Sequence, residues 1–276
     1  MSGIRVTYSG LISLVVGALG TVTGLIFILI VTRTLSVQEF GTWGLIISLF
    51  SYVILFEPVV GFWITREIAR GKESGRTAIF TSSLFSIGAV LVFLIIANFI
   101  SNPTDTDLGI LFFSSILIPV MFLNRTMNAI SLGHKPHALS MGQLIFGISQ
   151  AFMVLLFVYY FDMGVAGLII SVTISHVTSI FIQIVYSKEI LKKKINKKSI
   201  KKWLKISWLP IYPGLGGVIL RLDVVIFSIL TGSIIGIAYW TVAITLAQLV
   251  TIVGGISVAT YSKFLEGKNK EFFEEN

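Results

Sequence analysis

The sequence contains no cysteine, only three histidines and few charged residues, and each shortage excludes a class of protein. Without cysteine the chain has neither a disulfide framework nor a thiolate metal site. His134, His137 and His176 are too few and too scattered to form a histidine-rich metal cluster. Charged residues make up 12% of the chain, against about 25% in a soluble domain. We therefore expect no metal or other cofactor, and not a soluble globular domain.

What remains is a strongly apolar chain. Hydrophobic residues make up 55% of its 276 residues, and the mean hydropathy is +0.92. Eight apolar stretches are each close to the roughly 20 residues that a helix needs to cross a bilayer. These stretches are 9–32, 41–65, 78–100, 108–132, 138–161, 164–186, 206–230 and 233–261. The sequence therefore predicts an all-α, polytopic membrane bundle of about eight transmembrane helices.

Basic residues are concentrated in alternate loops between these stretches. One set of segments holds 19 of the 21 Lys and Arg residues, and only Arg33 falls on the other side, since Arg221 lies within a span. The 19 are Arg5, Arg66, Arg70, Lys72, Arg76, Arg125, Lys135, Lys188, Lys192, Lys193, Lys194, Lys197, Lys198, Lys201, Lys202, Lys205, Lys263, Lys268 and Lys270. Because basic loops stay in the cytoplasm, we expect a multi-pass protein of the cell membrane with both termini cytoplasmic. The net charge of +8 therefore does not indicate a nucleic-acid partner.

The basic segment 188–205 divides the chain. It separates an N-terminal six-helix lobe (1–187) from the first two helices of a second lobe (206–262), which a polar cytoplasmic tail (263–276) follows. Its apolar residues lie among lysines, which is typical of an interfacial helix on anionic lipid. A plain cytoplasmic anchor explains the same pattern. A faint repeat supports the division, because Phe40-Gly41-Thr42-Trp43 resembles Ile237-Ala238-Tyr239-Trp240 at a matching place in the topology.

Two charged residues, Arg221 and Asp223, lie well inside the apolar stretch 206–230. A charge near the bilayer centre costs at least about 2.5–3.5 kcal/mol, so it indicates a functional site. Residues two apart on a helix point to nearly opposite sides, so this pair cannot neutralise itself. A structural ion pair with another helix is one interpretation. The cluster of Pro and Gly at 210–217 favours the other, a broken helix that lines a cavity.

Three blocks of sequence resemble a known family. The first is the segment 31–45, with Arg33, Leu35, Glu39, Phe40 and Gly41, between the first two spans; the second is Thr65-Arg66-Glu67-Ile68-Ala69-Arg70. The third is Arg221-Leu222-Asp223 with Trp240 and Ala243. Together they resemble the polysaccharide-biosynthesis, lipid-linked oligosaccharide flippases of the multidrug/oligosaccharidyl-lipid/polysaccharide exporter superfamily. Ala238 stands where that family usually has a glycine.

The resemblance implies a central, positively charged cavity that opens alternately to each side and holds a lipid-linked phosphate. Arg33, Arg125 and Arg221 are the candidate substrate-binding residues, because a guanidinium pairs with phosphate oxygens through two parallel bonds. For Arg33 and Arg125, snorkelling at a helix end is the alternative. Glu57 and Asp223 are the candidates for ion coupling or for counter-charges to these arginines. We expect no catalytic residues.

The family has twelve to fourteen spans in two lobes, so this chain is expected to be a fragment or to be completed by another chain. The expected function is to flip a lipid-linked oligosaccharide from the cytoplasmic to the outer leaflet by alternating access, with membrane lipids as further partners. An enzyme is not expected, because the outer loops are too short to carry a catalytic loop. The alternatives are a cation-coupled exporter of drugs or small solutes from the same superfamily, and a helix bundle that transports nothing.

Overall fold

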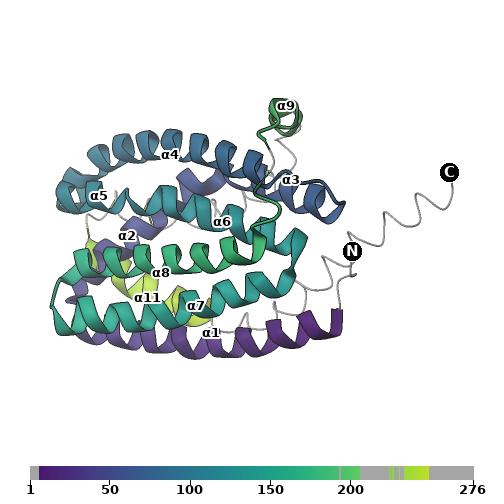
Figure 1. Ribbon diagram of the computed structural model, residues 1–276. Coiled ribbons are helices and arrows are strands. Elements are labelled where there is room, and N and C mark those ends of the chain that lie inside the picture. Colours follow the sequence, from purple (N-terminus) through teal and green to yellow (C-terminus); the bar gives the residue numbers. More distant parts are fainter. Residues whose placement is uncertain are drawn as a thin grey trace, which may run out of the picture.

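The computed structural model describes residues 6–192, 194–205 and 233–248, together with Val224, Ile226 and Leu230 singly. Every regular element in this part of the chain is helical, as the sequence predicts, and the long helices lie side by side in a bundle (Figure 1). The helices are α1 Val6–Thr34, α2 Val37–Val53, α3 Pro58–Ala69, α4 Gly75–Thr104, α5 Leu108–Ser114, α6 Leu117–His134, α7 Pro136–Val154, α8 Gly164–Ser187, α9 Lys197–Lys205 and α11 Ile234–Gln248. A 3-10 turn, Ile54–Phe56, joins α2 to α3, and a π-helical turn, Leu155–Tyr160, extends α7.

Five helices in the described residues are long and apolar enough to cross a membrane, or six if the bent pair α2 and α3 counts as one span. These six coincide with the first six predicted spans to within about one helical turn at each end. The seventh predicted span, 206–230, lies outside the described residues apart from three positions, and so do Arg221 and Asp223. Of the eighth predicted span, the structure describes the part in α11.

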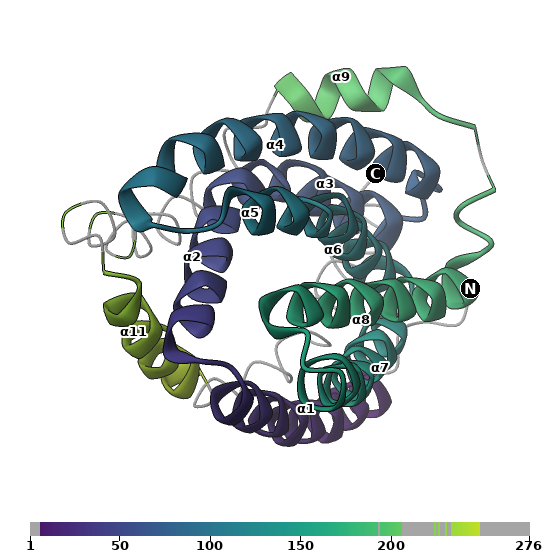
Figure 2. The same cartoon turned by 90° about the vertical axis from the view of Figure 1, so that its left-hand side faces the viewer.

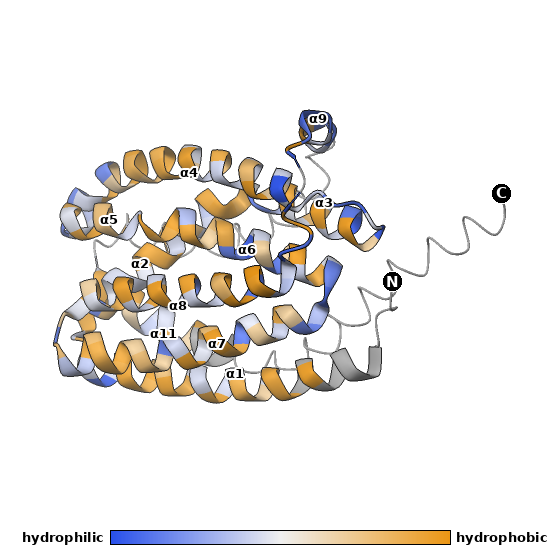
Figure 3. Cartoon of the chain, viewed as in Figure 1, coloured by the Kyte–Doolittle hydropathy of each residue, from blue (hydrophilic) through white to orange (hydrophobic). Residues whose placement is uncertain are grey.

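The outside of the bundle exposes many large apolar side chains. Leu84, Phe99 and Phe181 expose 60%, 74% and 65% of their surface, whereas Leu45 and Ile118 in the core are fully buried. Figure 3 shows apolar residues along the whole length of the long helices, with hydrophilic residues gathered mainly near their ends and on α9. An apolar outer surface of this extent is stable in lipid, where the hydrocarbon chains cover it.

Polar side chains inside the long helices are largely satisfied by their own backbone. The hydroxyl groups of Thr32, Ser48, Ser171 and Ser175 each donate to the carbonyl oxygen four residues earlier, at 2.6 to 2.9 Å. Lipid offers no water to an unpaired hydroxyl, so these bonds remove the cost of placing Ser and Thr within a span. They leave the apolar surface of each helix available for packing.

The second span, which was predicted as one uninterrupted helix, is broken near its middle. The axes of α2 and α3 differ by 62°. Pro58 is the first residue of α3, and its ring and missing N–H prevent α2 from continuing. The missing N–H of Pro58 leaves the carbonyl oxygen of Ile54 without its usual helical donor. That oxygen is paired locally, because the amide of Glu57 donates to it at 2.9 Å. The break therefore places Glu57 at the bend, inside the bundle.

The loops segregate by charge between the two ends of the bundle. The turns α3–α4 and α6–α7 and the segment that follows α8 lie at one end, which we call the basic end, and the turns α1–α2, α4–α5 and α7–α8 lie at the other (Figure 1). The basic end holds Arg66, Arg70, Lys72, Arg76, Lys135, Lys188 and the lysines of α9. This separation of charge agrees with the predicted topology. That the basic end faces the cytoplasm stays a prediction.

Helices at the basic end approach closely where glycine replaces a larger residue. A Cβ added to Gly133 of α6 would lie 2.6 Å from the backbone oxygen of Thr65 in α3 and 3.1 Å from the Cβ of Ile68. The same crossing carries a hydrogen bond, since the Thr65 hydroxyl donates to the carbonyl oxygen of Ala129 at 3.1 Å. The α3–α6 contact thus depends on glycine at position 133.

We predict that Gly133→Ala destabilises the protein by about 1–3 kcal/mol, because the added methyl group meets backbone that cannot move aside. The measurement is the thermal unfolding midpoint of the purified protein in detergent. Gly88→Ala in α4 is the matched control, because nothing lies within 4 Å of its added Cβ. Equal midpoints for the two variants would contradict the close α3–α6 contact.

The absence of native cysteine allows the topology to be tested with single cysteines. Asn102, near the end of α4, and Lys198, in α9, are both exposed and lie at opposite ends of the bundle. Asn102→Cys should react with an impermeant thiol reagent in intact cells, and Lys198→Cys only after the membrane is opened. Reaction of both from one side would rule out the arrangement.

Candidate functional site

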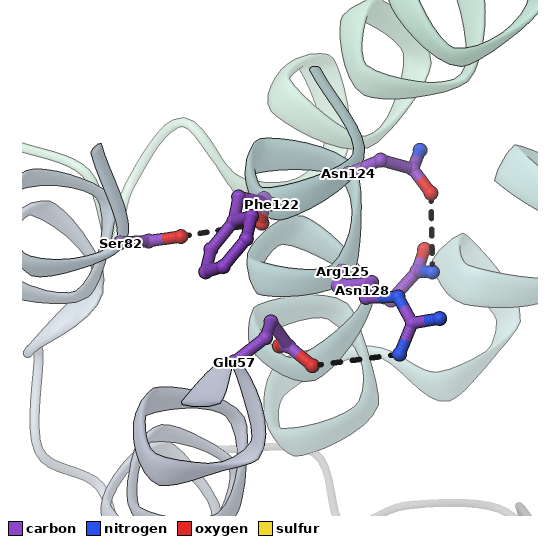
Figure 4. A network of polar contacts seen from close by, with 6 residues as sticks. All are labelled: Glu57, Ser82, Phe122, Asn124, Arg125 and Asn128. Carbon is purple, nitrogen blue, oxygen red and sulfur yellow. Dashed lines mark hydrogen bonds and ion pairs between the residues drawn. The ribbon is translucent and has the colours of Figure 1, made fainter. Parts of the chain in front are cut away.

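The described part of the bundle contains a buried carboxylate paired with a partly exposed guanidinium. Glu57 Oε2 and Arg125 Nη1 are 3.8 Å apart, and their side chains are 8% and 47% exposed. This distance is that of an ion pair and is too long for a direct hydrogen bond. Figure 4 shows the two side chains pointing toward each other, Glu57 from the bend before α3 and Arg125 from α6. Two residues from separate spans therefore form one charged site.

The local sequence explains why the carboxylate of Glu57 reaches α6. Glu57 directly precedes Pro58, the first residue of α3. The chain changes direction here instead of continuing along the axis of α2, and the Glu57 side chain turns inward. Gly61, one turn later, leaves room for the carboxylate, since its added Cβ would lie 3.1 Å from Glu57 Oε1. Proline and glycine thus set the place and the space for one buried charge.

A chain of side-chain hydrogen bonds runs beside Arg125 and ties α6 to α8. Ser131 donates to Gln183 Oε1 at 3.0 Å, and Gln183 Nε2 donates to Asn128 Oδ1 at 2.8 Å. Asn128 in turn donates to Asn124 Oδ1 at 3.3 Å. Gln183 and Asn124 are 0% and 7% exposed. Because Asn124 and Asn128 flank Arg125 in α6, the chain fixes the rotation of the helix that carries the guanidinium.

The amide of Gln183 is enclosed by a glycine on α7. A Cβ added to Gly142 would lie 2.7 to 2.9 Å from three atoms of the Gln183 side chain. His176, two turns earlier on α8, stacks on Phe146 of α7 with 4.6 Å between ring centroids. Polar residues of α6 therefore meet Gln183 of α8 beside a small residue of α7.

Of the predicted site residues that the structure describes, it brings two together. Glu57 and Arg125 meet, whereas Arg33 lies exposed in the last turn of α1, at the end opposite to the basic end. Arg221 and Asp223 lie outside the described residues. The sequence analysis did not connect Gln183 with Asn124 and Asn128, because residues about 55 apart show no pairing signal in one sequence. Within the described residues, no group of three or more His, Cys, Asp or Glu side chains could hold a metal ion.

Two of the sequence blocks behind the family resemblance have structural explanations. Ser36 and Glu39 form a capping box at the start of α2, where Ser36 N–H donates to Glu39 Oε2 at 2.9 Å and Glu39 N–H donates to Ser36 Oγ at 3.2 Å. In the second block, Glu67 pairs with Lys72 at 3.8 Å and accepts from Ser74 at 2.8 Å. The first block thus begins α2, and the second fixes the turn after α3.

The ion pair makes a stability prediction that a double-mutant cycle can test. Arg125→Ala should destabilise the protein by about 1–3 kcal/mol, because it leaves a buried acceptor without its partner. Glu57→Gln should lower the stability by less than Arg125→Ala does. The double variant should be more stable than Arg125→Ala alone. Thermal midpoints of the four proteins in one detergent give the coupling. Additive effects would show that the two side chains do not interact.

Comparisons with known proteins give a fold. No family model matches the sequence, and no curated protein matches it either. A solved structure of MATE in complex with MaD5 matches with a TM-score of 0.69 at 14% identity, over 97% of this chain and 69% of that one. An inward-facing multidrug resistance MATE family transporter of the MOP superfamily matches with a TM-score of 0.69 at 15% identity, over 92% of this chain and 65% of that one.

A third solved structure is the MATE multidrug transporter DinF-BH in complex with rhodamine 6G. It matches with a TM-score of 0.68 at 12% identity, over 94% of this chain and 65% of that one. The chain thus spans about two thirds of the length of the transporters that it matches. Identities this low establish fold and not activity. The chain has the helical-bundle fold of MATE transporters.

Proposed function

We propose that this chain forms part of a membrane transporter that exports small organic solutes by alternating access between two lobes. The fold supports transport, because the structures that share it are transporters of the superfamily that the sequence resembles. The observation that favours small solutes over a lipid-linked phosphate is the Glu57–Arg125 pair. The proposal reverses the order of the two functions that the sequence suggests.

A substrate at this site would meet little net charge. A pyrophosphate group needs an excess of positive charge, and an unpaired guanidinium supplies it well. In the described bundle the charge of Arg125 is offset by Glu57 at 3.8 Å. Arg33 adds nothing here, because it lies at the opposite end. The described site is therefore close to neutral, which suits an uncharged or cationic solute better than a phosphate.

In this proposal Glu57 is the coupling residue and Arg125 its counter-charge. A cation that enters beside the half-exposed Arg125 competes with its guanidinium for the Glu57 carboxylate. When the cation binds Glu57, Arg125 is free to move. Because Glu57 lies at the 62° bend between α2 and α3, a change in this pair acts on the part of the bundle with the weakest helical continuity. Binding at Glu57 is thereby linked to the angle of α3.

Flipping of a lipid-linked oligosaccharide is the second candidate, and one observation favours it. The Arg125 side chain is 47% exposed although it lies within a span, so part of its guanidinium faces away from Glu57. Arg221 would be a further contact of the phosphate and Asp223 a counter-charge, whereas Arg33 lies at the other end of the bundle. The lipid-linked sugar would then bind by its phosphate, and a second chain could supply the other lobe.

The test uses rhodamine 6G, the ligand of one solved relative, in cells from which the gene has been deleted. We expect cells with the restored wild-type gene to accumulate several-fold less dye, and cells with Glu57→Gln to accumulate as much as the deletion strain. Arg125→Lys keeps the counter-charge and should retain most export. A matched control is Glu73→Gln, which removes an exposed carboxylate in the α3–α4 turn. Immunoblots hold the protein level constant.

The two candidates give different results. The deletion strain could lose surface polysaccharide while its dye accumulation stays unchanged, with Arg125→Lys failing to restore the polysaccharide. That combined result would contradict solute export and support flipping. Unchanged dye and unchanged polysaccharide would contradict both.

A further inference from the structure

The short helix α9 lies across the bundle instead of along it. Figure 1 shows α9 end-on while the long helices run across the view, and Figure 2, turned by 90°, shows its full length outside α4. Since the long helices cross the membrane, α9 runs parallel to the membrane plane. It lies at the basic end of the bundle, on the outer side where lipid surrounds the protein.

One side of α9 is fixed to the protein. Trp203 is only 1% exposed and belongs to an apolar cluster with Ile64 and Ile68 of α3. The segment before α9 is fixed as well, because the amide of Asn196 donates to the buried Thr77 hydroxyl of α4 at 3.0 Å. In sequence Trp203 is one of several apolar residues among the lysines of 188–205, and the structure turns its side chain into the protein. Helix α9 is therefore held in place before any lipid binds.

The remaining surface of α9 combines positive charge with apolar side chains. Its sequence contains no acidic residue, and neither of the ion pairs seen in the described part of the chain involves residues 197–205. Leu204 is 46% exposed, and Ile195, two residues before the helix, is 39% exposed. The exposed lysines are Lys194, Lys197, Lys198, Lys201, Lys202 and Lys205.

We propose that α9 binds the head groups of anionic phospholipids and that Trp203 transmits this binding to α3. The lysines match the phosphates in charge, and Leu204 and Ile195 match the acyl boundary just below them. Trp203 packs in the same apolar cluster as Ile64 and Ile68 of α3, and α3 begins directly after Glu57. Anionic lipid at α9 therefore braces α3 at its bent angle, and this holds whichever solute the protein moves.

The experiment measures which lipids touch α9. Leu204→Cys is labelled with a fluorophore, and the protein is reconstituted in phosphatidylcholine vesicles with nitroxide-labelled phosphatidylglycerol or nitroxide-labelled phosphatidylcholine at equal mole fraction. One lysine favours an anionic head group by up to about five-fold. We expect quenching by phosphatidylglycerol to exceed that by phosphatidylcholine at least about two-fold, and to lose this excess in high salt. A label at Phe99→Cys, at the other end of α4, should show no preference.

Two charge-matched variants separate α9 from the general charge of the basic end. Replacing Lys197, Lys198, Lys201, Lys202 and Lys205 by Gln should abolish the preference. Replacing Arg70, Arg76, Lys135, Lys188 and Lys192 by Gln removes five charges from the same end and should leave the preference at Leu204→Cys largely intact. Equal quenching by both lipids in the otherwise wild-type protein, or equal losses in the two variants, would overturn the proposal.

A second readout tests transmission through Trp203. Phosphatidylglycerol should raise the thermal midpoint of the wild type and of Trp203→Phe, but not that of the α9 Lys→Gln variant. Trp203→Ala should keep the lipid preference and lose the stabilisation. Stabilisation of Trp203→Ala equal to that of the wild type would disprove transmission while leaving lipid binding in place. Neither readout needs transport, so failure of the proposed export is measured separately.

Discussion

The buried carboxylate of Glu57 is the constraint from which the arrangement of the described bundle follows. A carboxylate that is 8% exposed within a span must have a partner, and Arg125 of α6 supplies it at 3.8 Å. Arg125 is in turn held by the rotation of α6, which the amide chain through Asn128 and Gln183 sets against α8. Three spans that are distant in sequence are thus placed relative to one another by one charge.

Much of the fold could be predicted from the sequence, because lipid imposes simple rules. The six described spans follow from apolar length, and the charge of the loops follows from their alternation along the chain. The break in the second span was not predicted, although Pro58 lies within it, because proline within a membrane helix bends some helices and leaves others nearly straight. Which behaviour occurs depends on the neighbouring helices, and one sequence does not identify them.

The candidate site was predicted only in part for the same reason. Arg125 was expected as a substrate contact and Glu57 as a coupling residue or counter-charge, but periodicity does not reveal which spans are neighbours. Trp203 shows the complementary difficulty. In sequence it is one apolar residue among lysines, and only the packing of α3 and α4 shows that it points into the protein.

The faint sequence repeat gains meaning from the contact between α2 and α11, which lie next to each other in Figure 2. Gly41 and Gly44 of α2 face Ile234, Ile237 and Thr241 of α11 so closely that a Cβ at either glycine would clash. The two repeated segments therefore lie in helices that pack on one another. Their aromatic ends differ, since Trp43 is 7% and Trp240 is 48% exposed.

Solid-state NMR of the protein in lipid tests most directly whether Glu57 and Arg125 form an ion pair inside the membrane. With 13C in glutamate carboxyl carbons and 15N in arginine guanidinium nitrogens, dipolar recoupling reports carbon–nitrogen pairs within a few ångströms. Glu57 and Arg125 should give such a contact, and Glu57→Gln should remove it from the spectrum. A spectrum that is the same for the wild type and Glu57→Gln would contradict the pair and the coupling role built on it.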